Sequence, residues 1–432
     1  MLIAVENTIQ ALQAVVKRLP VGTNLALLQF LWMMLQGSLL GSRGAIFPAL
    51  VASGFGEETV RRCWGAMRYG VWQTTDLIEA WQEYVKGQGE WQEHDHGGYR
   101  AVSVDLTGFF RPCLKGWLVK HFHALVGRAL PAVVFGVVVW VGQIGSQRVP
   151  LLKMLIRAEG AEPTDAKMGV KVLEHLGRAL QPDEVAVFDA GFKLAALQAA
   201  QIKQAVVRLA ANVTASRNQV AEYKGRGRRP VYGEVVRPLA RCHKDKQIPA
   251  TPPDFTTEFE YQERTIQVKG WHDLILPGLK PDPANETFDV YVFVDPLYKQ
   301  PLVLATTLPL SAQTSFSLYQ DRWPVEQVPL AAKHMIGAHR QFVFAQQSCY
   351  RLPELALLAG GILTYLAAAL PPIPTGFWDR QPKSTPGRLR RLLARADFPE
   401  GHPFWPQLRK KQSVTDHLPK GVAAHRRTKA AP

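Results

Sequence analysis

The sequence predicts an α/β protein in which a mixed β-sheet core follows a helical segment. Apolar residues recur at helical spacing up to about residue 98, strand-like patterns begin at about residue 99, and a polar, basic stretch then interrupts the rhythm. The chain has 432 residues, which is long enough for about two to three domains. We expect segment boundaries at 1–98, 99–215, 216–300, 301–375 and 376–432.

Residues 1–98 contain a helix-turn-helix pattern. A short first helix is expected at 48–52 with Pro48 at its first position, followed by a Gly-containing turn and a second helix at 57–69. The second helix carries three basic residues, Arg61, Arg62 and Arg68. A helix-turn-helix would make this segment a DNA-binding domain. An ordinary helical hairpin with a solvated basic face fits the pattern at least as well.

The second segment alternates strands and helices. Three successive strands are expected at 101–106, 132–141 and 149–155. They are followed by a helix, a strand, a helix and a strand at 165–180, 185–188, 193–200 and 205–209. A three-strand meander followed by alternating helix and strand is the order that a ribonuclease H-like mixed sheet requires. A strand at 301–307 and a helical stretch from Thr314 would complete this core around a β-rich insertion at 216–300.

The charge balance points to a polyanionic partner. Lys and Arg number 51 against 36 Asp and Glu, which gives a formal net charge of +15. Residues 376–432 hold thirteen basic and four acidic side chains, or +9 of that total, and we expect a basic tail that is in part disordered. Nucleic acid is the usual partner for such an excess, although an anionic membrane surface would also fit.

Other features indicate a protein of the reducing cytoplasm. The four cysteines are too dispersed for a zinc knuckle or a disulfide framework, and they are Cys63, Cys113, Cys242 and Cys349. The N-terminus does not read as a signal peptide. The apolar run at 355–373 is interrupted by glycines and prolines that would leave only a short helix, so we interpret it as a buried core helix rather than a membrane span.

Two aspartates stand where predicted strands end. Asp105 follows the apolar residues 102–104, and Asp189 follows the strand 185–188 and precedes a glycine-assisted turn. A carboxylate at such a place is costly unless it ligates a metal or pairs with a cation. Either aspartate alone is more often a capping or salt-bridged residue than a catalytic one.

A third acid lies in a helix with regularly spaced cations. The spacing of Tyr319, Arg322, Glu326 and Lys333 places the last three near one face of a single helix. A carboxylate flanked by cations can bind a metal while the cations hold DNA phosphates on either side. The competing interpretation is a surface helix with a common Arg–Glu pair. That interpretation does not predict two strand-end aspartates ahead of the helix.

These residues resemble a known family. The Tyr-Arg-Glu-Lys spacing matches the signature of a large branch of bacterial insertion-sequence DDE transposases, and the motifs at 105–107 and 189–192 are similar to its two Asp motifs. The resemblance covers residues 99–370. It implies that two Mg²⁺ ions, for which Mn²⁺ can substitute, are bound by Asp105, Asp189 and Glu326. It also implies that the phosphate backbone at the transposon end is held by Tyr319, Arg322 and Lys333.

The resemblance further implies cleavage of double-stranded DNA at transposon ends, followed by attack of the freed 3′ hydroxyl on target DNA. A homodimer in a synaptic complex is implied as well, in the bacterial cytoplasm near the nucleoid. The sequence departs from the family at Ala190, where an Arg is frequent, and at 328–329, where Pro329 should kink the helix. The alternative function is a catalytically inactive or repurposed transposase that still binds DNA.

Trp271 is the only tryptophan of the insertion and follows a cation and a glycine. In the resembling family the insertion faces the active site, so Trp271 is a candidate platform for a flipped base, worth about 1–3 kcal/mol per stacked base. A tryptophan packed in the core of the insertion is the more common situation.

Two further groups of residues were weighed as metal ligands. Adjacent residues on a linker rarely converge on one ion, so His94-Asp95-His96 is interpreted as a solvated loop. Cys242-His243 lacks partner ligands, and the glycine-rich basic loop at 224–230 precedes no helix, so neither ATP nor NAD is implied.

Overall fold

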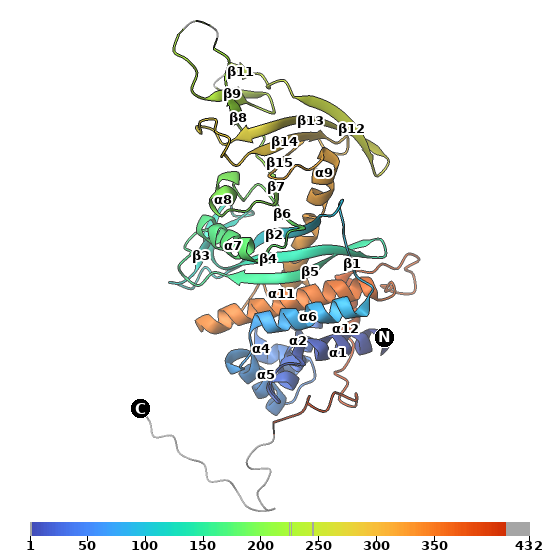
Figure 1. Cartoon of the computed structure of the whole chain (residues 1–432). Coiled ribbons are helices and arrows are strands. Elements are labelled where there is room, and N and C mark those ends of the chain that lie inside the picture. The colour runs from blue at the N-terminus through green and yellow to red at the C-terminus, as the bar shows by residue number, and fades with distance from the viewer. Residues whose placement is uncertain (1, 224, 226, 244–245, 412–432) are drawn as a thin grey trace, which may run out of the picture.

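The structure is a computed structural model that describes residues 2–223, 225, 227–243 and 246–411. The molecule is elongated (Figure 1). A helical domain lies at one end, a strand-rich region lies at the other, and a mixed β-sheet runs between them. The expected α/β class with a large mixed sheet is confirmed.

The helical domain contains six helices, as the apolar spacing predicts. They are α1 (Leu2–Val16), α2 (Thr23–Leu35), α3 (Ser38–Gly41), α4 (Ile46–Ala52), α5 (Glu57–Tyr69) and α6 (Thr74–Gln88). The predicted second helix of the helix-turn-helix pattern is therefore α5, but Pro48 is the third residue of α4 rather than its first. A proline is accommodated there because the first four N–H groups of a helix lack intrahelical partners.

The central part of the sheet has the strand order β5-β4-β2-β6-β7. These elements and the helices between them are β2 (Arg100–Phe110), β4 (Arg128–Ile144), β5 (Gln147–Arg157), α7 (Asp165–Ala179), β6 (Glu184–Phe188), α8 (Leu194–Ala199) and β7 (Ala205–Arg208). β4 is antiparallel to β2 and β5, whereas β6 is parallel to β2 and β7. α7 and α8 bury their apolar residues against one face of this sheet. The alternation of strands and helices expected for the core is confirmed.

Two short strands flank the central sheet, β1 (Gln92–Glu93) and β3 (Val119–His123), and both pair with β4. The strand-rich region continues the same sheet beyond β7, in the order β15-β14-β13-β8-β9. Its strands are β8 (Ala215–Val220), β9 (Gly233–Val236), β12 (Phe255–Tyr261), β13 (Arg264–Ile275), β14 (Phe288–Val294) and β15 (Leu302–Thr306). A separate hairpin is formed by β10 (Arg241–His243) and β11 (Lys246–Ile248).

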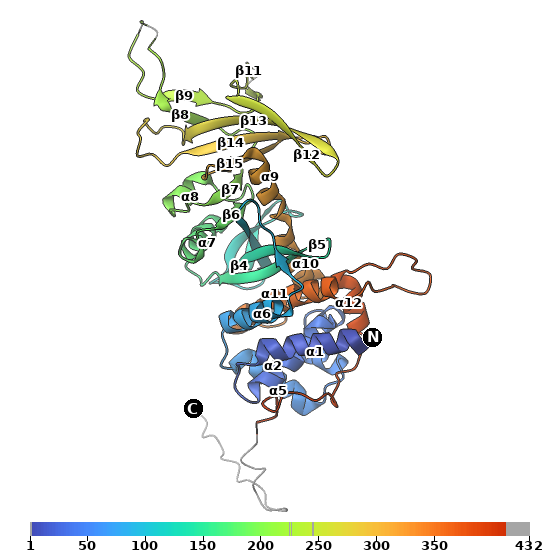
Figure 2. The same ribbon diagram turned by 45° about the vertical axis from the view of Figure 1, so that its right-hand side comes forward.

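The helical run that follows β15 is not a single α-helix, contrary to the sequence prediction. It consists of α9 (Ala312–Gln320), the 3-10 segment η1 (Trp323–Glu326), α10 (Gln327–Leu330) and the π-helical segment η2 (Ala331–Met335). Pro324 and Pro329 each lack the N–H that a regular helix needs, and the interruptions follow from that. Only Pro329 was foreseen as a disruption. Figure 2 shows the run lying alongside the sheet between β15 and α11.

Helix α11 (Gln346–Ala369) joins the sheet to the helical domain, because it contacts β5 on one side and α2 and α5 on the other. Among the described residues it is the one helix long and apolar enough to cross a membrane, and 89% of its most apolar window is buried. The expected buried core helix is confirmed, but the expected short length is wrong. Gly360 does not interrupt the helix; it lets the backbone of α10 approach so closely that a Cβ there would lie 2.7 Å from the Val328 carbonyl oxygen.

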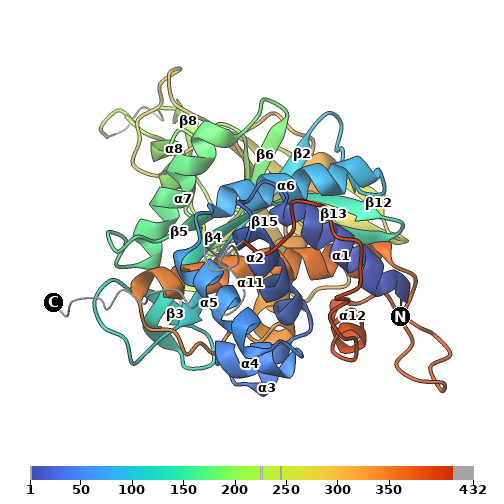
Figure 3. The same cartoon turned by 90° about the horizontal axis from the view of Figure 1, so that it is seen from below.

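Residues 376–411 form part of the helical domain rather than a separate tail. α12 (Pro386–Leu393) buries Leu389 and Leu393, and Phe398 packs edge-on against Trp32. Gln36 Nε2 donates to the Ala396 carbonyl oxygen at 2.8 Å. The pattern of cations hid these apolar positions, which are spaced to face the domain. In Figure 3 α12 lies close to α1, and residues 412–432, where disorder was expected, lie outside the described residues.

Candidate active site

Asp105 and Asp189 lie on neighbouring parallel strands. β2 pairs with β6 so that Ser103 is opposite Val187. Extending this register by two residues sets Asp105 opposite Asp189, at the carboxyl end of β6. Asp189 Oδ1 accepts a hydrogen bond from the Gly191 N–H at 2.9 Å, which fixes the turn that leaves the strand. The two strand-end aspartates are therefore adjacent, as they must be to share a ligand.

Glu326 reaches the same region from the helical run. Segment η1, which ends at Glu326, contacts β2, β4 and β5. Arg322 Nη1 forms an ion pair with Glu326 Oε1 at 2.7 Å, and the Arg322 side chain is buried whereas that of Glu326 is half exposed. Burial disfavours the charge of Arg322, but the bond to Glu326 and the charges of Glu326 and Asp189 outweigh it and raise the Arg322 pKa.

The electrostatics of Asp105 reveal how close the three acids are. Burial raises the pKa of Asp105 to about 6, and the negative charges of Asp189 and Glu326 add to that effect. The N–H of Leu106 donates to Asp105 Oδ1 at 2.9 Å and only partly offsets it. The structure thus brings all three sequence-predicted acids into one electrostatic cluster.

Lys333 belongs to this cluster as well. Burial lowers the pKa of Lys333 to about 8, and the negative charge of Asp105 opposes this reduction. The Lys333 ammonium lies 5.4 Å from the centre of the Phe109 ring, on the strand that carries Asp105. Because Lys333 is in the π-helical segment, its direction does not follow from regular helical spacing.

Tyr319 and Trp323 occupy contrasting environments. Tyr319 is buried under α9, and that burial raises its pKa. Trp323 is 48% exposed, and its ring lies 4.1 Å from the Arg322 guanidinium carbon. Sequence reasoning singled out Tyr319 and overlooked the more accessible aromatic side chain beside Glu326.

A cavity of about 580 Å³ opens beside the two aspartates. Its lining includes Asp105, Asp189 and a second polar pair, in which His121 Nδ1 lies 2.7 Å from Asp165 Oδ1. Sequence reasoning missed His121 because the short strand β3 was not predicted. The cavity also has an apolar side formed by residues of α7 and by Phe192.

Trp271 is not an exposed platform, and that expectation is wrong. Its side chain is fully buried, and its indole N–H donates to the Pro252 carbonyl oxygen at 2.9 Å. The neighbouring Gly270 points to the opposite face of β13, where the Phe255 ring covers it. Successive strand residues face opposite sides, so Trp271 enters the core shared with β14. The alternative interpretation, a tryptophan packed in the strand-rich region, is confirmed.

His94 and His96 do not form a solvated loop, contrary to the sequence interpretation. Both imidazoles contact the carboxylate of Asp321 and are largely buried. Asp321 caps α9 directly before Arg322. The signal was not visible in the sequence because the contacting residues are 227 positions apart.

Comparison of the sequence with models of known protein families found no match, and comparison with curated proteins found none either. The functional argument therefore stands on the chain's own residues.

Proposed function

We propose that the protein is a DDE-type DNA transposase that cleaves DNA at transposon ends and joins the freed 3′ hydroxyl to target DNA. The observation that carries the proposal is the cluster of Asp105, Asp189 and Glu326, which come from two adjacent parallel strands and a later helical run. Three acids with nearby cations at one sheet edge suit phosphodiester chemistry better than a structural ion-pair network.

The strand order supports a ribonuclease H-like core. The first three strands, β2, β4 and β5, form an antiparallel meander, and β6 and β7 then add in parallel on the other side of β2. This arrangement sets the first and fourth strands side by side, which is why Asp105 and Asp189 meet. The long continuation through β15, β14 and β13 corresponds to the expected β-rich insertion.

The acids have the chemistry of a divalent-cation site. Oxygen ligands suit Mg²⁺ or Mn²⁺, and the mutual repulsion that raises the Asp105 pKa is the repulsion that such ions would relieve. Asp105, Asp189 and Glu326 would hold the ions. A pair of bound ions supplies charge that stabilises the entering and leaving oxygens of the phosphodiester.

The chain's cations account for substrate binding. Arg322 is held rigidly between Glu326 and the Trp323 ring, so its guanidinium is preorganised for a phosphate. Lys333 is buried close to Asp105 and would gain a counter-charge when a phosphate enters. We propose double-stranded DNA as the substrate, a homodimer as the working form, and the bacterial cytoplasm as the location.

The proposed function is tested with DNA that carries the inverted repeats flanking the protein's own reading frame. The purified protein is incubated with such a duplex and Mg²⁺, and the products are mapped to nucleotide resolution. We expect nicks at the repeat ends that leave 3′ hydroxyls and that require the metal. DNA binding without any metal-dependent nick would instead favour the non-catalytic DNA-binding alternative.

Salt dependence provides a prediction for the basic C-terminal segment. Deleting 376–432 would also uncover the helical domain's core, so point substitutions are the cleaner test. Arg391 and Arg395 are exposed on and after α12. If both contact phosphates, Arg391→Gln/Arg395→Gln should reduce the slope of log binding constant against log salt by about 1.8.

A matched control is available in α5, where Arg61 pairs with Glu57 and Arg62 with Glu58. We expect Arg61→Gln/Arg62→Gln to change the salt slope less, because these cations are already neutralised. A larger change for the α5 pair than for the α12 pair would instead point to α5 as the DNA-contacting helix.

A further inference from the structure

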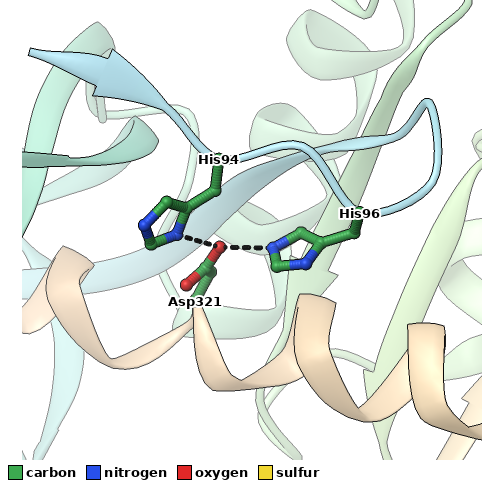
Figure 4. Close-up of side chains that lie close together, drawn as sticks. All are labelled: His94, His96 and Asp321. Carbon is green, nitrogen blue, oxygen red and sulfur yellow. Dashed lines mark hydrogen bonds and ion pairs between the residues drawn. The ribbon is translucent and has the colours of Figure 1, made fainter.

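The most convergent set of metal-ligand side chains in the described residues lies outside the carboxylate cluster. His94 Nδ1 lies 2.8 Å from Asp321 Oδ2, and His96 Nε2 lies 2.7 Å from the same oxygen. Possible ligand atoms of the three residues all lie within 4.8 Å of one another. Figure 4 shows both imidazoles pointing toward Asp321 from the loop between β1 and β2.

The three side chains are held in place from several directions. The N–H of His94 donates to the Val141 carbonyl oxygen at 3.1 Å, which ties the loop to β4. The Asp321 carbonyl oxygen accepts a hydrogen bond from Ser103 Oγ at 2.6 Å, which ties the end of α9 to β2. The Asp321 side chain is fully buried, and those of the two histidines are only 15% and 16% exposed. The group is therefore built on rigid elements rather than on a mobile linker.

The carboxylate also has the outer partner that a metal ligand usually has. Arg148 Nε lies 3.3 Å from Asp321 Oδ1, the oxygen that does not face the histidines. Carboxylates that ligate a metal are typically oriented by such a contact on the second oxygen. Oδ2 is thereby left to point between the imidazoles.

The donor set selects a class of ion. Two imidazole nitrogens and one carboxylate oxygen suit Zn²⁺ and similar borderline ions, whereas Mg²⁺ prefers oxygen ligands alone. With ligand bonds of about 2.0–2.2 Å in tetrahedral geometry, the separations from Oδ2 would have to widen by about 0.5 Å. Three protein ligands leave a fourth position for water, on the side where the histidines are partly exposed.

We propose that His94, His96 and Asp321 bind one divalent transition-metal ion of the zinc class. The ion ties the loop that leads into β2 to the end of α9, one residue before Arg322. It acts as a structural staple that fixes the helical run against the strand carrying Asp105. The proposal does not depend on transposase activity, because the ligands are separate from Asp105, Asp189 and Glu326.

The test uses the full-length protein without an affinity tag, stripped with a chelator and given one equivalent of Co²⁺. We expect the visible absorption bands of four-coordinate Co²⁺ with nitrogen ligands, and one ion retained per chain after gel filtration. His96→Gln should lose both. The exposed His175 gives a matched control, since His175→Gln should retain both. Asp189→Asn should also retain both, which separates this site from the carboxylate cluster.

Thermal melting supplies a second readout that requires no activity. At a hundredfold excess over the dissociation constant, Zn²⁺ should raise the melting temperature of the stripped wild-type protein by about 5 °C, and that of His96→Gln by none of this amount. If His96→Gln does not fold, His94→Gln takes its place. Absence of cobalt bands in the wild-type protein, or their persistence in a folded histidine variant, would overturn the proposal in favour of a metal-free hydrogen-bonded cluster.

Discussion

Asp105→Asn, Asp189→Asn and Glu326→Gln are each expected to lower Mg²⁺-dependent DNA cleavage by about 10³-fold, because each removes charge from the site where the transition state is stabilised. The substitutions keep the size of each side chain, so the packing around the strand ends is preserved. Removing the repulsion at Asp105 should also leave the metal-free protein at least as stable as the wild type. Initial rates of nicking on an end-containing duplex measure the first effect.

Glu174→Gln is the matched control, because Glu174 is an exposed acid on α7. It should cleave at the wild-type rate. DNA binding by all four variants, measured without divalent ions, should stay within a few-fold of the wild type. Near-normal nicking by any one of the three site variants would show that its residue is wrongly assigned.

Lys333→Met is expected to stabilise the protein while impairing its function. Burial lowers the pKa of Lys333 from its ordinary value of 10.5 to about 8, so the charged form destabilises the folded state. A shift of this size corresponds to about 3 kcal/mol of unfolding free energy, present in full below pH 8. Methionine fills similar space without a charge. Activity should fall because the phosphate loses its cation.

The sign of the pH dependence follows from the same shift. Between pH 8 and 10.5 the unfolded chain binds more protons at Lys333 than the folded one, so wild-type stability gains from this residue as pH rises. The advantage of Lys333→Met should therefore be largest near pH 7 and should shrink toward pH 10. Denaturant titrations without divalent ions measure it, with Lys167→Met at an exposed position of α7 as the control. An advantage that is absent at pH 7, or independent of pH, would contradict the burial of a charged Lys333.

The part of the site that could be predicted from sequence is the part encoded locally. Asp105 and Asp189 each follow a short apolar strand, and the strand periodicity alone locates both at strand ends. Their mutual proximity also followed, because the order of strands and helices restricts the sheet topology. The helical spacing identified Glu326 with its flanking cations.

The remaining features depend on long-range packing that no local pattern records. Asp321 and His94 meet only because α9 folds back along β2. Trp271 is buried because the strand-rich region extends the main sheet and has both faces covered, which a strand pattern cannot reveal. The α12 region looked like a charged tail because its cations outnumber the apolar residues, Leu389 and Leu393, that dock it on the helical domain.

The central claim is that divalent ions bind between Asp105, Asp189 and Glu326. Fe²⁺ substituted for Mg²⁺ generates hydroxyl radicals that cut the polypeptide next to the bound ion, and mass spectrometry locates the cuts. We predict cuts near all three residues, suppressed by excess Mg²⁺ and absent in Asp189→Asn. Cuts confined to the region of His94 and Asp321, or cuts that excess Mg²⁺ does not suppress, would contradict the account.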